Sequence, residues 1–482
     1  MEGQKKIIKP GLGLSLVPFA CLIVFMLVGV VVFQGEPQIP LIMACAVTSI
    51  IGIKLGHSWE DLENAMIESN AMTMQANFII MIVGCLIGVW IAGGVVPGMI
   101  FYGLKIFTPS MFLLLLPIIC AIVAVSTGSA WSTAGTMGTA AMGIGAGLGI
   151  PVALTAGAVV TGSSFGDKMS PLSDSTNLAS GILGVNVFDH IKHMLYTTVP
   201  SFILSVIIFG FLGMRYKGVE ADTTQIDMIL KTLSANFSIS PLIFIAPISV
   251  ILMVIFRVPA VPGMLGGTLI GVIFALSQGA DVSSLLENLF YGFNIDTGNA
   301  MVDRLLNRGG MLEMMETISL VICAMCFGGL IKKVGCLDSI LEVILKYCRT
   351  RKSIIASNVV LCVAMNFMAA DQYMAIVIPG QMFAPIYKRL NLHPKNLSRT
   401  LEDAGTLTSG LVPWSTCGGV YKTTLGVSAF QYGRFHFLGL INPILAIIYG
   451  IFGIALEPLD KSKPIGDRLE DEEGEVAVGY TL

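Results

Sequence analysis

The residues best suited to chemistry in this chain lie in two polar stretches, each set between long apolar segments. Residues 166–177 read GDKMSPLSDSTN, and residues 399–418 read RTLEDAGTLTSGLVPWSTCG. Carboxylates among many hydroxyls can bind a hard cation such as Na⁺, and a carboxylate can bind a proton instead. An ordinary surface loop would explain either stretch in a soluble protein, so the surrounding elements decide the interpretation.

The composition indicates that those surroundings are a membrane. Of 482 residues, 54% are hydrophobic and 12% are charged, whereas soluble domains carry about 25% charged residues. Several apolar windows approach the roughly 20 residues that a helix needs to cross a bilayer. They are continuous and lack the alternation of a β-barrel, so the sequence predicts an all-α polytopic membrane protein. The windows are 14–33, 78–96, 112–125, 202–214, 242–256, 264–276, 318–331, 354–368 and 441–456.

The chain also repeats itself. LGVNVF at 183–188 recurs as LGVSAF at 425–430, an offset of 242, and LEN at 62–64 recurs at 286–288, an offset of 224. Several matches in order, at nearly constant offset, predict a duplication. The increase in the offset predicts an insertion in the second copy, for which the polar segment 296–310 is the candidate.

The basic residues predict that the two copies have opposite orientations in the membrane. The connection after residue 96 holds one basic residue, Lys105, whereas its counterpart after residue 331 holds six. Because cytoplasmic loops are enriched in Lys and Arg, equivalent loops are expected on opposite faces. The two copies are then inverted-topology repeats, and both termini are cytoplasmic.

The predicted organisation follows these two repeats. Each contains a re-entrant hairpin, 109–148 or 353–390, and a discontinuous transmembrane helix, 152–184 or 399–425. The predicted segments are a cytoplasmic N-terminus (1–10), the first inverted repeat (11–217), a linker (218–239), the second inverted repeat (240–457) and an acidic cytoplasmic tail (458–482).

The hairpin tips and helix breaks are expected to form one site. The tips read STGSAWST at 126–133 and NFMAADQY at 366–373. Short polar turns at membrane depth are tolerated only where they are buried in protein or line a cavity. Unwound backbone offers carbonyl oxygens to a cation, and half-helix N-termini favour an anion. The four elements therefore predict a secondary transport site near the midplane.

The predicted site takes carboxylates from both copies. Asp167, Asp174, Asp371 and Asp403 are predicted Na⁺ ligands, because a carboxylate inside a membrane costs at least about 2.5 kcal/mol. Glu402 directly precedes Asp403, so only one of the two is expected to point inward. The other predicted binding residues are side chains of the same elements: Lys168, Ser170, Ser173, Ser175, Thr176, Asn177, Ser129, Trp131, Ser132, Thr406, Thr408, Ser409, Ser415 and Thr416.

Several of these assignments have structural alternatives. Asp167 and Lys168 would form a buried ion pair that holds the break together, and Asp174 would cap the resumed half-helix. The hydroxyls of the first tip would serve helix packing, and Trp131 would pack rather than line a cavity. Asp371 has no basic neighbour in sequence, which favours a functional role.

The motifs resemble a known family. GSAWSTAGTMG at 128–138, AGAVVTGSSFGDKMSPLSDSTNLA at 156–179 and EDAGTLTSGLVPWSTCG at 402–418 are similar to the NhaC family of sodium/proton antiporters, within the wider ion transporter superfamily. With the topology, the resemblance covers nearly the whole chain. It implies Na⁺/H⁺ exchange in a bacterial-type inner membrane, and some members resemble exchangers of malate and protons for lactate and Na⁺. The superfamily implies scaffold and transport regions, an elevator-like movement and homodimers.

The predicted function is therefore antiport of Na⁺ for H⁺ by alternating access, with the two ions competing for carboxylates and with no cofactor. The alternative is Na⁺/H⁺-coupled exchange of small carboxylates, which Lys168 and the hydroxyls could bind. Inverted broken helices argue against a channel, and five scattered histidines argue against a membrane enzyme. The sequence lacks a Walker motif, which excludes an ATP-driven pump. Its net charge of −3 gives no indication of a nucleic-acid partner.

Overall fold

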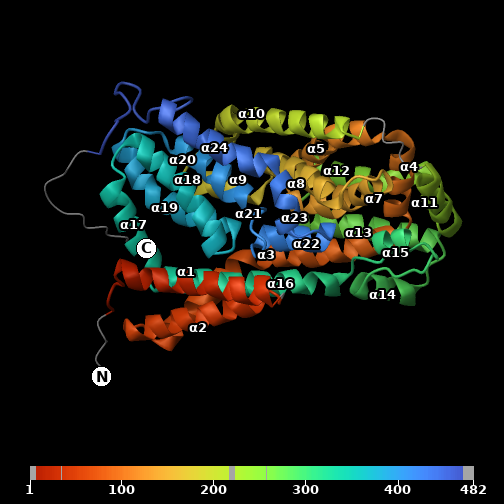
Figure 1. The fold of residues 1–482 in the computed structure, drawn as a ribbon, viewed down its shortest axis with the longest axis horizontal. Helices are drawn as coiled ribbons and strands as arrows, with labels where there is room; N and C mark the ends of the chain where they lie inside the picture. The colour runs from red at the N-terminus through yellow and green to blue at the C-terminus, as the bar shows by residue number, and fades with distance from the viewer. Residues whose placement is uncertain (1–6, 34, 217–222, 257, 470–482) are drawn as a thin grey trace.

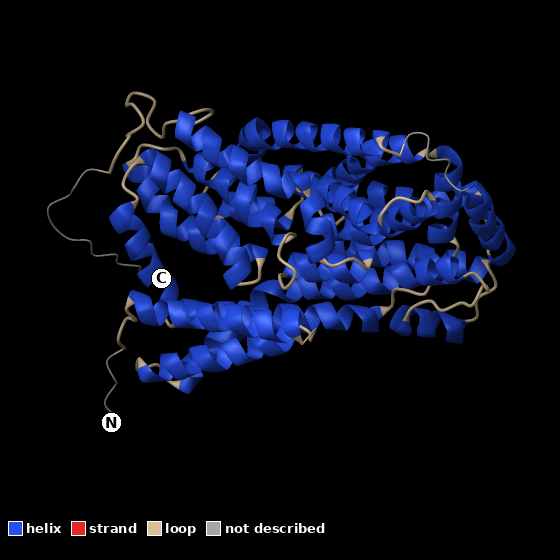
Figure 2. Ribbon diagram, viewed as in Figure 1, coloured by secondary structure: helices blue, strands red, loops and turns tan. Residues whose placement is uncertain are grey.

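The described part of the molecule is almost entirely helical. The computed structural model describes residues 7–33, 35–216, 223–256 and 258–469 (Figure 1). Loops connect the helices (Figure 2), and the β contacts within these ranges are two isolated bridges. The predicted all-α class is therefore confirmed. Residues 1–6 of the predicted N-terminus, 218–222 of the predicted linker and 470–482 of the predicted acidic tail lie outside the described residues.

The first half of the chain holds helices α1 to α10, whose ends follow from local sequence. Ser58 and Asp61 form a capping box that starts α3, and the Asn186 side chain caps α10. Gly128, with φ +65°, ends α5 and allows the turn into α6. The bounds are α1 (Leu12–Met26, continued by the π-helical Leu27–Val32), α2 (Gln38–Lys54), α3 (Trp59–Ala92), α4 (Val95–Ile106), α5 (Pro109–Thr127), α6 (Ala130–Thr133), the π-helical Ala134–Gly138, α7 (Thr139–Gly147), α8 (Val152–Met169), α9 (Asp174–Gly181) and α10 (Val187–Met214).

The second half holds helices α11 to α24. Where the first half has one 34-residue helix, α3, the second has α14, α15 and α16 separated by polar residues. The inverted relation of the two halves stays a prediction. The bounds are α11 (Thr223–Asn236), the 3₁₀ turn Pro241–Phe244, α12 (Ile245–Ile255), α13 (Ala260–Ser277), α14 (Val282–Tyr291), α15 (Ala300–Leu306), α16 (Met311–Lys333), α17 (Cys336–Tyr347), α18 (Arg351–Met368), α19 (Gln372–Arg389), α20 (Pro394–Thr400), the π-helical Leu401–Thr406, α21 (Leu407–Ser409), α22 (Thr416–Leu425), α23 (Ala429–Tyr432), the 3₁₀ turn Gly433–Phe435 and α24 (Phe437–Phe452).

The helices include several that can cross a membrane. Among the described residues, five are long and apolar enough, and two further bent pairs raise the number to as many as seven. The pairs bend by 89° between Ile226–Asn236 and Pro241–Val250, and by 58° between Ala429–Phe435 and Phe437–Phe452. The five spans are Leu12–Val30, Thr73–Ala92, Pro109–Thr127, Val187–Met214 and Met311–Lys333.

The helices form two groups that lie side by side along the long axis of the molecule (Figure 1). In the lower layer, α16 packs against α2 and α3, and α2 packs against α1. In the upper bundle, α5 packs against α8 and α10, and α24 packs against α10 and α18. Helix α22 lies between the groups, where it contacts α16 and the π-helical Ala134–Gly138.

Two large apolar clusters fix the hairpins in place. One contains side chains of the first hairpin, α5 to α7, together with α11, α12 and α13. The other contains side chains of the second hairpin, α18 and α19, together with α1, α2 and α16. The first hairpin also packs against α12 through α5, and the second packs against α9 through α19, so each hairpin contacts a helix from the other half of the chain.

Candidate functional site

The first helix break lies at residues 170–173, between α8 and α9. The last turns of α8 pack closely on α5. A Cβ at Gly162 or Gly166 would collide with the carbonyl oxygens of Pro117 and Ala121 on α5, so only glycine permits this approach. The break is therefore held against the hairpin that α5 begins.

Asp167 connects this break to the first hairpin tip. Its half-buried carboxylate interacts with the Ser173 side chain and with the backbone of Ala130, the first residue of α6. The start of a helix carries free N–H groups and a positive dipole end, which favour an anion. These two contacts therefore offset part of the cost of burying the negative charge of Asp167.

The second helix break lies at residues 410–415, between α21 and α22. Lys168 and Asp403 form a fully buried ion pair between the two breaks. The Asp403 Oδ1 atom also accepts hydrogen bonds from Thr197 Oγ1 at 2.9 Å and from Asn442 Nδ2 at 2.7 Å. Arg399 Nε lies 4.0 Å from its Oδ2. The predicted alternative of a Lys168–Asp167 ion pair is therefore wrong, because Lys168 pairs across the chain. A buried pair with additional donors is a strongly coupled unit, and removal of one partner leaves an expensive charge.

Glu402 is also inside the molecule, contrary to the expectation that only one of the two adjacent acids would be. Glu402 and Asp403 are each fully buried. They lie in the π-helical Leu401–Thr406, whose wider turn differs from the 3.6-residue period on which the expectation depended. Asn366 of α18 stabilises this segment by donating to the Gly405 carbonyl oxygen at 2.6 Å.

The Glu402 carboxylate has an unusual environment. Neither of its oxygens has a hydrogen-bond partner among the described residues. The hydroxyls of Ser175 and Thr406 are neighbours outside hydrogen-bonding geometry, and Lys168 and Asp167 lie within electrostatic range. The sequence marks this position only by the adjacent acids Glu402 and Asp403. It gives no indication that the Glu402 carboxylate would lack a hydrogen-bond partner.

Asp371, at the second hairpin tip, is the N-cap of α19. Its Oδ1 atom accepts the backbone N–H groups of Tyr373 at 2.8 Å and Met374 at 3.1 Å. Its Oδ2 atom accepts from Thr416 Oγ1 at 2.7 Å, which ties the tip to the start of α22. The carboxylate is fully buried and is engaged by fixed donors from its own tip and from the second break.

Asp174 differs from the other predicted acids because its side chain is exposed, at the first residue of α9. Tyr373 of the second tip is nevertheless within electrostatic range of Asp174, Asp167 and Asp371. The first break and the second tip therefore face one another. Sequence reasoning missed Tyr373, whose only signal was its place beside Asp371.

Most of the remaining predicted residues hold the breaks and tips together. Ser129 caps α6 by accepting the Ser132 N–H at 3.2 Å, and Ser415 caps α22 by accepting the Gly418 N–H at 3.0 Å. Trp131 packs within the first apolar cluster, which agrees with the alternative that it packs rather than lines a cavity. Hydrogen bonds to nearby backbone or hydroxyl groups also involve Ser170, Ser173, Thr176, Asn177, Thr408 and Ser409.

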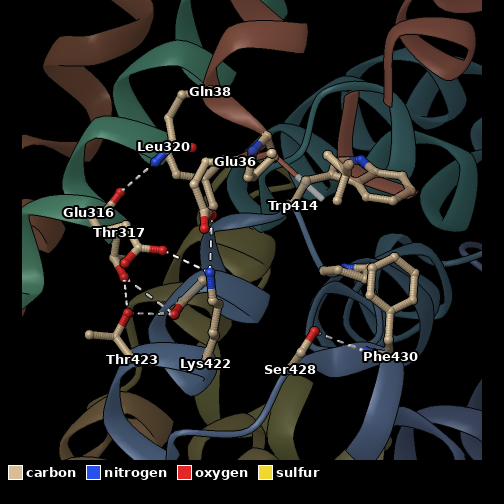
Figure 3. A pocket seen from close by; sticks show the side chains of 15 residues that line it. Glu36, Gln38, Glu316, Thr317, Leu320, Trp414, Lys422, Thr423, Ser428 and Phe430 are labelled. Carbon is tan, nitrogen blue, oxygen red and sulfur yellow. Dashed lines mark hydrogen bonds and ion pairs between the residues drawn. The ribbon is translucent and has the colours of Figure 1, made fainter. Parts of the chain in front are cut away.

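A cavity of about 380 Å³ opens beside the second break (Figure 3). It lies between α16, the segment before α2 and the loop that carries Trp414. Lys422 of α22 donates to Glu36 at 3.0 Å and to Glu316 of α16 at 2.8 Å, so it links α22 to the lower layer (Figure 3). None of these three charged residues was predicted to take part in the site.

Comparison with known proteins assigns this chain to a family. The model of the Na⁺/H⁺ antiporter family matches residues 12–176 and 163–454. The chain belongs to the Na⁺/H⁺ antiporter family. The Na⁺/H⁺ antiporter NhaC of Alkalihalophilus pseudofirmus is 40% identical over 451 residues, which cover 93% of this chain and 97% of that protein. The predicted resemblance is confirmed.

Other relatives of this Na⁺/H⁺ antiporter family member carry different names. The malate-2H⁺/Na⁺-lactate antiporter of Bacillus subtilis is 39% identical over 88% of this chain and 91% of that protein. The arginine/ornithine antiporter ArcD of Halobacterium salinarum is 33% identical over 92% of this chain and 93% of that protein. Family membership and the apolar helices identify a multi-pass membrane protein and support an antiporter function.

Proposed function

We propose that this protein exchanges Na⁺ for H⁺ across the cytoplasmic membrane by alternating access, with both termini in the cytoplasm. In this proposal, the two halves of the chain are inverted repeats whose helix breaks face one another. Na⁺ and H⁺ compete for carboxylates at the breaks, so that the site carries one ion outward and the other inward.

The observation that carries the proposal is the group of acids gathered at the two breaks. Asp167, Glu402 and Asp403 come together with Lys168, and only Asp403 is paired with it. A carboxylate away from water costs several kcal/mol unless a proton or a cation neutralises it. Competition between the two for the same oxygens is a direct mechanism for exchange.

The four carboxylates predicted to bind Na⁺ have different roles in this proposal. Asp167 is the exchanging acid, because its contacts are one side chain and one helix start. Asp403 and Asp371 position the breaks, because ammonium, amide, hydroxyl and backbone donors already engage them. Asp174, which is exposed, lies at the approach to the site.

The alternative function is Na⁺/H⁺-coupled exchange of small carboxylates. It is favoured by the malate/lactate name of the Bacillus subtilis relative. A carboxylate substrate would need a cationic partner, and Lys168 is the buried candidate at the first break. Because Lys168 is already paired with Asp403, the geometry supports a cation site better than a carboxylate site.

A vesicle assay separates the two functions. The purified protein is reconstituted into liposomes that enclose a pH-sensitive dye, and NaCl, LiCl or KCl is added outside, with and without malate or lactate. We expect a change of internal pH on addition of Na⁺ alone. A pH change that requires an organic acid would select the alternative, and the absence of any Na⁺-dependent change would contradict both.

A further inference from the structure

We propose that Glu402 is a ligand of the transported Na⁺, together with Asp167 and the hydroxyls of Ser175 and Thr406. This inference rests on the proposed Na⁺/H⁺ exchange and names the side chains that hold the cation. Asp167 and Ser175 flank the first break, whereas Glu402 and Thr406 lie in the π-helical segment that precedes the second. The ion is thus held between the two halves of the chain.

The unpartnered oxygens around Glu402 are the main support. The Glu402 side chain is fully buried, and neither carboxylate oxygen has a hydrogen-bond partner within the described ranges. The buried Thr406 hydroxyl also lacks one there, and Ser175 is a further neighbour. Ser175 shares a hydrogen bond of 3.2 Å with Ser173, so the oxygens left free for a hard cation are those of Glu402 and Thr406.

The charges around Glu402 match one monovalent cation. Lys168 and Asp167 lie within electrostatic range of it, Lys168 pairs with Asp403, and Arg399 lies 4.0 Å from Asp403. Among these buried and half-buried groups, three carboxylates face two cationic side chains, which leaves a formal charge of −1. Asp174 is also within electrostatic range of Asp167, but it is exposed to water and is not counted. One Na⁺ neutralises this group, whereas a divalent ion leaves an excess positive charge in a buried position.

The other acids of the second copy are less suitable ligands. Asp403 already accepts from Lys168, Thr197 and Asn442, and Asp371 already accepts from two backbone N–H groups and Thr416. A cation at either acid would have to displace these donors. At Glu402 a cation displaces no hydrogen bond.

The test is the stabilisation of the purified full-length protein by Na⁺, measured as the melting temperature in choline buffer with added NaCl or KCl. Glu402→Gln keeps the size of the side chain and removes its charge. We expect its melting temperature without Na⁺ to equal or exceed that of the wild type, because an unpaired charge is lost. We expect its half-saturating Na⁺ concentration to rise by about tenfold or more.

Glu313→Gln is the matched control. Glu313 of α16 is a half-buried acid outside the proposed ligand set, and it accepts the Gly309 N–H at 2.6 Å. This variant should keep the wild-type response to Na⁺. An unchanged response in Glu402→Gln would overturn the ligand assignment, and so would a wild type that Na⁺ stabilises no more than K⁺ does.

Two further results keep the inference and the proposed function separate. If Glu402→Gln does not fold, Thr406→Val, which removes one hydroxyl, serves as the second variant. It must raise the half-saturating Na⁺ concentration by roughly threefold. An unchanged Na⁺ response in Thr406→Val would overturn the assignment. A wild type that binds Na⁺ through Glu402 but shows no Na⁺-driven pH change in vesicles would contradict the exchange and support the ligand assignment.

Discussion

The two hairpin tips differ in the origin of the carboxylate at the start of their second helix. In the first tip, the neutral Ser129 caps α6, and the carboxylate at that helix start belongs to Asp167 of α8. In the second tip, Asp371 caps α19 itself, and Thr416 of the second break donates to it. An anion stabilises each helix start. In the first tip this anion comes from another helix, whereas in the second tip it comes from the cap residue itself.

This difference separates a fixed carboxylate from one that can change partners. Asp371 is held by hydrogen bonds of its own tip, and a cation could use it only by disturbing the cap of α19. Asp167 links the first break to the first tip, so a cation that binds it alters how the two meet. We therefore expect ion exchange to depend on Asp167 much more than on Asp371.

The largest effect is expected when the ion pair of the second break is cut. Asp403→Asn leaves the buried Lys168 ammonium without its anion, a change that costs about 3–5 kcal/mol in buried pairs. We expect a much lower melting temperature of the purified protein. The double variant Lys168→Met/Asp403→Asn removes both charges and should recover most of the loss. A double variant that melts below the single one would show that the pair is not the stabilising unit.

Asp167→Asn should have the next largest effect. It removes the proposed exchanging charge while preserving the size of the side chain, so the melting temperature should change little. We expect the Na⁺-driven pH change in vesicles to fall by about 100-fold. Asp189→Asn, at an exposed acid in the first turn of α10, is the control and should keep wild-type exchange. Full exchange in Asp167→Asn would mean that the first tip holds a structural carboxylate, as the second does.

Substitutions of Asp371 should reveal a cap rather than an ion ligand. Asn caps helices as well as Asp does, whereas Ala loses the cap at a cost of about 1 kcal/mol. Asp371→Asn should therefore keep exchange within roughly threefold of the wild type, and Asp371→Ala should lower the melting temperature. Vesicle assays and thermal unfolding measure these effects. Loss of exchange in Asp371→Asn as severe as in Asp167→Asn would remove the distinction between the two tips.

The smallest effect is expected at the cavity beside the second break. Lys422 links α22 to Glu36 and Glu316, but all three side chains are at least 42% exposed. Exposed ion pairs contribute about 0–1 kcal/mol and weaken with salt. Lys422→Gln should therefore change the melting temperature only slightly, and less at high KCl than at low KCl. A loss of exchange comparable to that of Asp167→Asn would place this cavity on the ion path.

The fold class and the polar stretches could be predicted because they depend on composition and local pattern. The end of α8 at Met169 and the start of α22 at Thr416 fall inside the polar stretches 166–177 and 399–418. Contacts across the chain could not be predicted. Local sequence offered Asp167 as the partner of Lys168, but the partner is Asp403, 235 residues away. The π-helical turn that buries Glu402 beside Asp403 also leaves no mark in a 3.6-residue period.

The central claim, that Na⁺ and H⁺ compete for the same carboxylates, is tested most directly by Na⁺ titrations of exchange in vesicles at a series of pH values. Competition for one group predicts that the half-saturating Na⁺ concentration rises by up to about tenfold for each unit of pH decrease, with an unchanged maximal rate. A maximal rate that falls with pH while the half-saturating Na⁺ concentration stays constant would contradict the account.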